Sequence, residues 1–210
     1  MFFQLLDHDI SFPSPTLAEE DGLLAIGGDL SVERLLLAYS NGIFPWFSEG
    51  EPILWYAPHQ RCVIYPDRIT ISKSTQKLID RQVFHITFNQ AFGEVIQKCA
   101  KIKRLGQDGT WITNEMQEAY IELHQKGYAH SIEVWQNSVL VGGLYGVKIN
   151  RIFCGESMFS EVSNASKIAL IALSKMDIDL IDCQLPNDHL MSLGAEMIGY
   201  DEFITLMKND

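Results

Sequence analysis

The order of elements in the second half of the chain predicts an α/β protein with a mixed sheet. A helix is expected to start after Thr113, whose hydroxyl can cap it, and to end at Gly127. Three runs rich in β-branched and aromatic residues follow, and the short polar turns between them predict a three-stranded meander. A helix, a buried-looking strand at 180–184 and a last helix complete a pattern typical of helices packed on a sheet.

A change in amino-acid composition at Arg61 predicts two domains, at residues 1–60 and 61–210. The first is rich in glycine, proline and aromatic residues, and it contains one clear helix that Ser31 can cap. Residues 44–58 are expected to form loops. In the second domain, the expected strands are 62–65, 85–88, 130–135, 139–148, 151–158 and 180–184. The expected helices are 72–81, 89–101, 113–126, one from Asn164 or Ser166 to 176, one near 187 and one at 201–207, with a loop at 105–110.

Composition excludes several classes of protein. The chain has 210 residues and is 47% hydrophobic, which is enough to bury a sizeable core. It contains no stretch of about 18 apolar residues, so no membrane-spanning helix is expected. The first residues lack a basic segment and include an early acid, unlike a secretory signal. The four cysteines are far apart without CxxC spacing, which argues against zinc or disulfides and indicates the cytoplasm.

Charge is distributed unevenly along the chain. The formal net charge is −11 at pH 7, which by itself argues against nucleic-acid binding. Residues 61–104 nevertheless carry nine basic and three acidic side chains, a charge of +6. The rest of the chain carries seven basic and 24 acidic side chains, a charge of −17. This asymmetry indicates one surface for a polyanion and another for a cationic partner, although uneven charge on a solvated surface is an equal alternative.

Two polar residues end the expected strand at 180–184. Alternation of side chains along a strand places Asp182 and Gln184 on one face. A carboxylate beside an amide at the end of a buried strand suits proton handling next to an acyl centre, and the alternative is a pair that satisfies loop amides. Cys183 faces the other way and is expected to be a core residue, although Cys183 or Cys154 with a histidine would make a thiol nucleophile.

Glu156 lies within an otherwise apolar expected strand. A buried carboxylate is costly unless it is paired or functional, so Glu156 is a candidate site residue unless it points to solvent at a strand edge. The six histidines show no metal-ligand spacing. The glycine pairs at 27–28 and 142–143 match neither a phosphate-binding loop nor a dinucleotide fingerprint. We therefore expect no metal and no nucleotide cofactor.

Two groups of side chains suit RNA. Tryptophans in glycine- and proline-rich, loop-like settings can stack on bases, unless they fill the core, and they are Trp46, Trp55 and Trp111. Three basic residues fall at i, i+4 and i+8 of the expected helix at 72–81, and they are Lys73, Lys77 and Arg81. They form a ridge suited to phosphates or, alternatively, an ordinary solvated face.

Longer motifs follow one another along nearly the whole chain. They are FPSP (12–15), GLLAIGGDL (22–30), NGIFPWF (41–47), GTWIT (109–113), HSIEVW (130–135), LVGGLYGV (140–147), FCGESMFS (153–160), NASK (164–167), LIDCQ (180–184), NDH (187–189) and SLGA (192–195). In this order they resemble the bacterial leucyl/phenylalanyl-tRNA–protein transferases.

The resemblance implies a small N-terminal domain followed by an acetyltransferase-like (GNAT-type) domain. It also implies transfer of leucyl, phenylalanyl or methionyl groups from aminoacyl-tRNA to proteins that begin with Arg or Lys, which marks them for degradation by the N-degron (N-end rule) pathway. Because the donor is already activated, no cofactor or metal is expected. The expected partners are aminoacyl-tRNA and the acceptor protein, without a membrane and with the enzyme as a monomer.

The resemblance assigns a role to each candidate site residue. Asp182 and Gln184 are implied to be the catalytic pair. Trp46 and Trp111 match positions that hold the 3′-terminal adenosine. The implied pocket for the transferred side chain contains Leu144, Phe153, Glu156 and Ile181, with Ser157 beside it. Lys73, Lys77 and Arg81 match part of a cluster that faces the tRNA.

Two other functions fit parts of the sequence. An acetyltransferase-like fold also serves acyl-CoA, but that chemistry needs a pyrophosphate-binding loop before a helix, and residues 161–163 (EVS) stand there instead. A tRNA-binding module without catalysis is the third possibility, and the presence of Asp182 and Gln184 argues against it.

Overall fold

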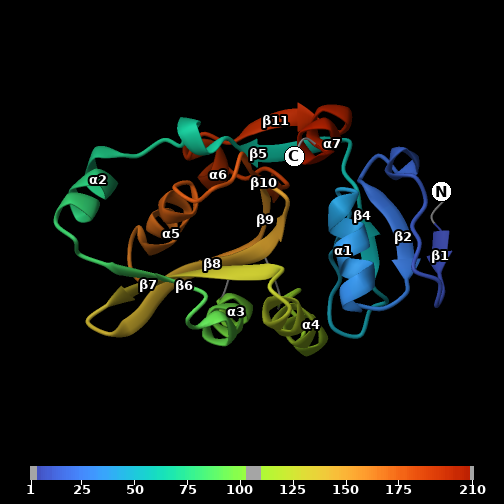
Figure 1. Cartoon of the computed structure of the whole chain (residues 1–210), viewed down its shortest axis with the longest axis horizontal. Coiled ribbons are helices and arrows are strands. Elements are labelled where there is room, and N and C mark those ends of the chain that lie inside the picture. The colour runs from blue at the N-terminus through green and yellow to red at the C-terminus, as the bar shows by residue number, and fades with distance from the viewer. Residues whose placement is uncertain (1–3, 103–109, 209–210) are drawn as a thin grey trace.

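The computed structural model describes residues 4–102 and 110–208. It contains two sheets side by side along the long axis of the molecule (Figure 1). The expected loop at 105–110 lies outside the described residues except for Thr110, and so do Lys103 and Arg104 of the basic segment. Within the described residues, no helix is long and apolar enough to cross a membrane.

The N-terminal region folds around a four-stranded sheet with the order β1-β2-β4-β3. Its elements are β1 (Gln4–Leu6), a 3₁₀ turn (Pro15–Leu17), β2 (Leu23–Gly27), α1 (Val32–Ser40), β3 (Phe44–Pro45) and β4 (Leu54–Tyr56). The expectation of loops throughout 44–58 is wrong, because β3 pairs with β4 in antiparallel register. These strands are two and three residues long, too short for side-chain alternation to reveal them.

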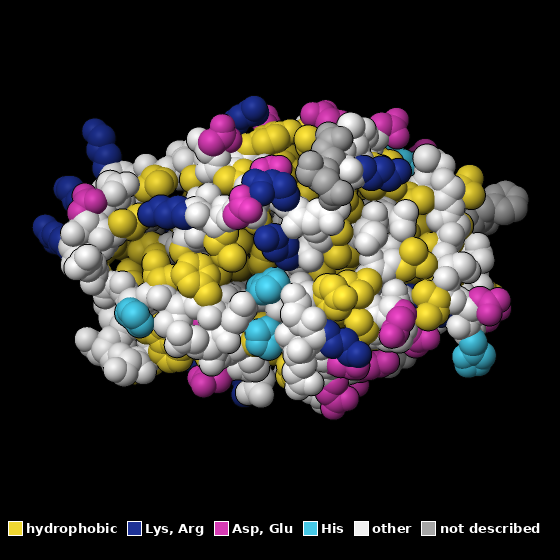
Figure 2. Space-filling model, viewed as in Figure 1, with side chains coloured by type: hydrophobic (Ala, Val, Ile, Leu, Met, Phe, Trp, Pro, Cys, Tyr) yellow, Lys and Arg dark blue, Asp and Glu magenta, His cyan; other side chains and the backbone are white. Residues whose placement is uncertain are grey.

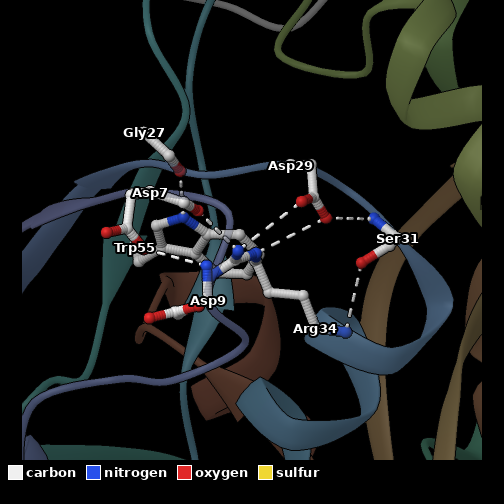
Figure 3. A network of polar contacts seen from close by, with 7 residues as sticks. All are labelled: Asp7, Asp9, Gly27, Asp29, Ser31, Arg34 and Trp55. Carbon is white, nitrogen blue, oxygen red and sulfur yellow. Dashed lines mark hydrogen bonds and ion pairs between the residues drawn. The ribbon is translucent and has the colours of Figure 1, made fainter.

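Buried polar contacts fix this small sheet against α1 (Figure 3). Trp55 is fully buried and its indole N–H donates to the carbonyl of Gly27 at 2.9 Å. It is therefore a core residue and is not available to stack on a nucleotide base. Arg34 is also fully buried, and it donates to the carbonyl of Asp7 at 2.8 Å and pairs with Asp29 at 3.4 Å. Ser31 caps α1 as the sequence predicts, since its side chain accepts from the Arg34 backbone N–H.

The larger sheet has seven strands in the order β11-β5-β10-β9-β8-β7-β6. Its strands are β5 (Gln60–Ile64), β6 (His85–Phe88), β7 (Ala129–Gln136), β8 (Val139–Ile149), β9 (Ile152–Ser160), β10 (Leu180–Gln184) and β11 (Glu196–Gly199). The helices are α2 (Lys73–Asp80), α3 (Phe92–Lys101), α4 (Asn114–Gln125), α5 (Ala165–Leu173), α6 (Asp188–Ser192) and α7 (Tyr200–Lys208), with a 3₁₀ turn at Pro66–Arg68. The mixed sheet is confirmed, because β9 and β10 are parallel whereas the other pairs are antiparallel. Among the described strands of the larger sheet, the sequence prediction lacked only the short β11. In the smaller sheet it lacked all four strands, including β2 with five residues.

Helices cover both faces of the larger sheet (Figure 1). α3 and α4 lie on one face and α5 on the other. Alternation along β8 divides the core accordingly, with Tyr145 in the cluster that includes α3 and α4 and Leu144 in the cluster that includes α5. Gly142 lets α5 approach closely, because a Cβ there would lie 2.4 Å from the Cβ of Ala165. The 142–143 glycine pair therefore serves packing.

Strands β9 and β10 separate before either of them ends. The parallel pairing of β9 with β10 covers three residue pairs and ends with Asp182 opposite Cys154. β9 continues to Ser160 while β10 ends at Gln184. The second half of β9 therefore runs on without pairing with β10.

Candidate functional site

Asp182 and Gln184 meet at an irregularity where β10 ends. The register between β10 and β5 shifts between these two residues, and Gln184 has a left-handed backbone with φ of 59°. Simple alternation therefore does not apply here. Instead, the backbone N–H of Gln184 donates to Oδ1 of Asp182 at 2.9 Å. A left-handed non-glycine residue costs about 1–3 kcal/mol, and such strain is typical of functional sites.

A buried arginine holds the carboxylate of Asp182. Arg61, the second residue of β5, donates from Nε and Nη2 to the two carboxylate oxygens at 2.9 and 3.0 Å. Both side chains are almost completely buried, at 1% and 0% exposure. The guanidinium carbon of Arg61 lies over the rings of Phe44 and Phe203, 4.9 and 4.7 Å from their centroids. Asp182 is therefore closed to solvent, and it acts on Gln184 through the backbone.

Glu156 completes the polar cluster from β9. It is 9% exposed, and its two oxygens accept from Nε2 of Gln184 at 3.0 Å and from the Tyr120 hydroxyl at 3.1 Å. The hydroxyls of Tyr120 and Tyr39 are also hydrogen-bonded to each other. Glu156 is therefore buried and hydrogen-bonded, with partners from α1, α4 and β10, and it does not point to solvent at a strand edge.

Burial controls the ionisation of Glu156. Loss of solvent is the main reason that its pKa rises from 4.5 to about 7, and the nearby Asp182 also raises it, while hydrogen bonds from Tyr39, Tyr120 and Gln184 act in the opposite direction. Burial, together with Glu156, also raises the pKa of the Tyr39 and Tyr120 hydroxyls well above 10. These tyrosines therefore stay protonated and act as donors to the carboxylate.

The apolar residues assigned to a side-chain pocket lie on the other face of the sheet. Leu144, Phe153 and Ile181 are 1–3% exposed and belong to the core cluster that includes α5. Ile181 is the register partner of Phe153, so these two residues are neighbours. Ser157 follows Glu156 on β9 and is half-buried. The structure thus brings Glu156 to Gln184 and groups the three apolar side chains separately.

Trp46 and Trp111 line one cavity of about 1040 Å³ between the N-terminal region and the α3–α4 layer. Trp46 is 39% exposed and lies tilted against Tyr56 at 5.8 Å between centroids. Trp111 precedes α4, whose Tyr120 reaches Glu156. The polar cluster does not line this cavity itself, but Tyr56 stacks on Phe44, which in turn contacts Arg61.

The basic ridge lies at the opposite end of the molecule from the N-terminal sheet (Figure 1). Lys73 and Lys77 belong to α2 and Arg81 is its C-cap, and all three are exposed. Figure 2 shows basic side chains gathered at the end of the molecule where α2 lies. The ridge and the tryptophan cavity are therefore separate surfaces.

Comparison with known proteins gives the family. The model of the leucyl/phenylalanyl-tRNA protein transferase N-terminal domain matches residues 28–59, and the leucyl/phenylalanyl-tRNA protein transferase model matches residues 63–208. The chain belongs to the leucyl/phenylalanyl-tRNA–protein transferase family. Similar relatives with that name come from Flavobacterium psychrophilum (56% identity, 97% of this chain and 98% of the relative), Flavobacterium johnsoniae (57%, 96% and 97%) and Desulforapulum autotrophicum (53%, 97% and 90%).

The family assignment confirms the resemblance inferred from the motifs, and the protein is an aminoacyltransferase. Sequence reasoning missed three residues of this transferase's polar cluster: Arg61, Tyr39 and Tyr120. The sequence contained an indication for Arg61, because a charged residue next to the apolar run 62–65 needs a partner if it is buried. The two tyrosines look like ordinary core residues of amphipathic helices.

The ionisation of Glu156 predicts a pH dependence of stability. Because its pKa rises to about 7 from 4.5, the folded transferase keeps a proton in this window that the unfolded chain has lost. The free energy of unfolding therefore falls as pH rises through the window, by up to about 1.4 kcal/mol per pH unit from this group. Glu156→Gln should remove the effect, so the variant should gain stability relative to wild type, by a few kcal/mol, between about pH 5 and pH 8.

Denaturant unfolding of both proteins across this pH range measures the difference. A constant difference between variant and wild type would show that Glu156 titrates alike in the folded and unfolded chains.

Proposed function

We propose that this transferase moves leucyl, phenylalanyl and methionyl groups from aminoacyl-tRNA to the N-terminal amine of proteins that begin with Arg or Lys. The observation that carries the proposal is the fixed amide of Gln184. Its backbone N–H is held by Asp182 and its side-chain NH2 by Glu156, at the point where β9 and β10 separate. An oriented amide suits a reaction that mainly requires correct placement of two substrates.

The reaction is aminolysis of an ester that is already activated. The amine nitrogen attacks the aminoacyl carbonyl, a C–N bond forms, and the ester C–O bond to the tRNA breaks. The proton lost by the amine ends on the 3′-terminal oxygen of the released tRNA. An α-amine has a reference pKa of about 7.7–8.0, so a useful fraction is neutral at pH 7. The step requires no ATP, metal or cofactor.

In this proposal Gln184 orients the attacking amine and Glu156 orients the amide of Gln184. Above about pH 7, where Glu156 is mainly ionised, its carboxylate only accepts hydrogen bonds, so it holds the NH2 of Gln184 and directs the carbonyl oxygen of that amide away from itself. This oxygen can accept an N–H of the attacking amine and orient it. Asp182 is enclosed by Arg61, so its contribution is to fix Gln184 through the backbone. Backbone amides near Ser157 are candidates for stabilising the oxyanion.

In this proposal the transferred side chain packs against Leu144, Phe153 and Ile181, which are 1–3% exposed in the structure, so the core must open here to admit it. These residues provide an apolar surface directly behind the strands that carry Asp182 and Glu156. An apolar slot opened between these residues would suit side chains unbranched at Cβ, as in Leu, Phe and Met. Discrimination against Val or Ile by shape alone is limited to roughly 10–200-fold.

The tRNA contacts two surfaces of different character. Trp46 and Trp111 hold the terminal adenosine in their shared cavity by stacking, worth about 1–3 kcal/mol per base. Lys73, Lys77 and Arg81 contact phosphates and read no sequence. The acidic remainder of the chain attracts the cationic acceptor end. The enzyme then acts as a cytoplasmic monomer that marks proteins for the N-degron pathway.

A transfer assay tests the substrates. Radiolabelled leucyl-, phenylalanyl- and methionyl-tRNA should label peptides that begin with Arg or Lys, and peptides with an acetylated N-terminus should stay unlabelled because they lack the amine. Valyl-tRNA should be slower by roughly 10–200-fold. Equal transfer from valyl- and leucyl-tRNA would refute the pocket, and labelling of peptides that begin with Asp as readily as Arg would refute the acceptor preference.

The dependence of tRNA affinity on salt concentration distinguishes phosphate contacts at the basic ridge from base stacking in the tryptophan cavity. Lys73→Ala with Lys77→Ala should flatten the slope of log affinity for tRNA against log salt, by roughly 0.7–0.9 for each phosphate that the variant no longer neutralises. Trp111→Ala should lower affinity equally at every salt concentration, because stacking releases no counterions.

The matched control replaces two exposed lysines elsewhere, Lys126→Ala with Lys208→Ala, and should leave the slope unchanged. Binding at three salt concentrations, with thermal melts as a folding check, gives the answer. An unchanged slope in the α2 double variant would contradict phosphate binding by this helix.

A further inference from the structure

We propose that Arg61 is a positioning residue that couples β3, which lies next to the tryptophan cavity, to β10, which carries Asp182 and Gln184. Its guanidinium donates to both carboxylate oxygens of Asp182 on β10, and its guanidinium carbon lies over the ring of Phe44 on β3. The inference rests on the proposed roles of Gln184 and Trp46, because these are the two groups whose separation Arg61 would set.

The first half of the coupling runs from Arg61 to the amide of Gln184. Two parallel hydrogen bonds of 2.9 and 3.0 Å fix the plane of the Asp182 carboxylate. One oxygen of that carboxylate, Oδ1, also accepts the backbone N–H of Gln184. Any tilt of the carboxylate therefore moves the left-handed residue whose amide faces Glu156.

The second half runs from Arg61 to the cavity. Phe44 lies against the guanidinium and stacks on Tyr56, whose ring contacts Trp46. Both Tyr56 and Trp46 line the cavity, and Trp46 directly follows β3. Arg61 is the second residue of β5, close to the predicted domain boundary, so it contacts both regions from the segment that joins them.

Stability alone is a poor reason for this arrangement. Removing a buried ion pair in favour of apolar residues of similar volume is often neutral or stabilising. Moreover, Nη1 of Arg61 is buried without a hydrogen-bond partner among the described residues, which is a further cost. What the guanidinium supplies is a planar fork that meets two carboxylate oxygens while its carbon lies over two rings. The point charge of lysine cannot reproduce this combination.

The same structure contains a matched control. Arg34 is the other arginine that is fully buried among the described residues, and it also pairs with one aspartate (Figure 3). Its contacts stay within the N-terminal region, at Asp7 and Asp29. Arg34→Lys therefore reproduces the chemical change and the loss of packing without touching the catalytic strand.

The test compares Arg61→Lys with Arg34→Lys in single-turnover transfer from phenylalanyl-tRNA to an Arg-initiated peptide. At a temperature where thermal melts show each protein folded, Arg61→Lys should lower the transfer rate about 10–100-fold, the effect expected of a small misplacement, with little change in affinity for tRNA. Arg34→Lys should keep the wild-type rate per folded molecule. Activity in Arg61→Lys that falls only in proportion to its unfolded fraction would overturn the proposal.

A second pair of variants covers the case in which Arg61→Lys does not fold. Phe44→Leu and Phe203→Leu each remove one ring that lies against the guanidinium, but of the two only Phe44 stacks on Tyr56, whose ring contacts Trp46. The proposal expects Phe44→Leu to slow transfer several-fold more than Phe203→Leu, and equal effects would contradict it. Wild-type transfer is measured alongside, so that failure of the proposed substrates appears as an inactive wild type and not as a property of Arg61.

Discussion

The buried ion pair between Arg61 and Asp182 is the interaction on which the site depends. Two charges removed from water are tolerated only when their geometry is good, and here both carboxylate oxygens meet the guanidinium within 3.0 Å. The pair joins residues 121 positions apart and lies between β5 and β10, where the register shifts. The irregular end of β10, and with it the position of Gln184, follows from satisfying this carboxylate.

A second carboxylate lies close by in a different environment. Hydroxyls and an amide bind Glu156 where a guanidinium binds Asp182, and burial raises the pKa of Glu156 to about 7. Asp182 pairs with its arginine, and Glu156 contacts the amide that is proposed to meet the substrate. Pairs of carboxylates in contrasting environments are a common way to separate structural and proton-handling roles.

The sequence predicted the parts of the fold that have clear periodicity. The helix after Thr113, the meander and the strand at 180–184 all appear, because each is long or strongly patterned. The strands within 44–58 were missed, since two or three residues show no period. Asp182, Gln184 and Glu156 could be named from motifs and from the cost of a buried acid, and the structure brings them together. The contact between Tyr39 and Tyr120 could not, because it joins residues 81 positions apart. A charge beside the apolar run 62–65 indicates that Arg61 needs a partner, but not that the partner is Asp182, 121 positions away.

A double-variant cycle on the single-turnover transfer rate tests most directly whether Gln184 and Glu156 act as one unit. Gln184→Ala removes the oriented amide, and Glu156→Gln removes the carboxylate that orients it. Groups that act together are strongly non-additive, so Gln184→Ala should slow transfer by roughly 100-fold and Glu156→Gln should add little in that background. Independent effects that multiply in the double variant would contradict the account.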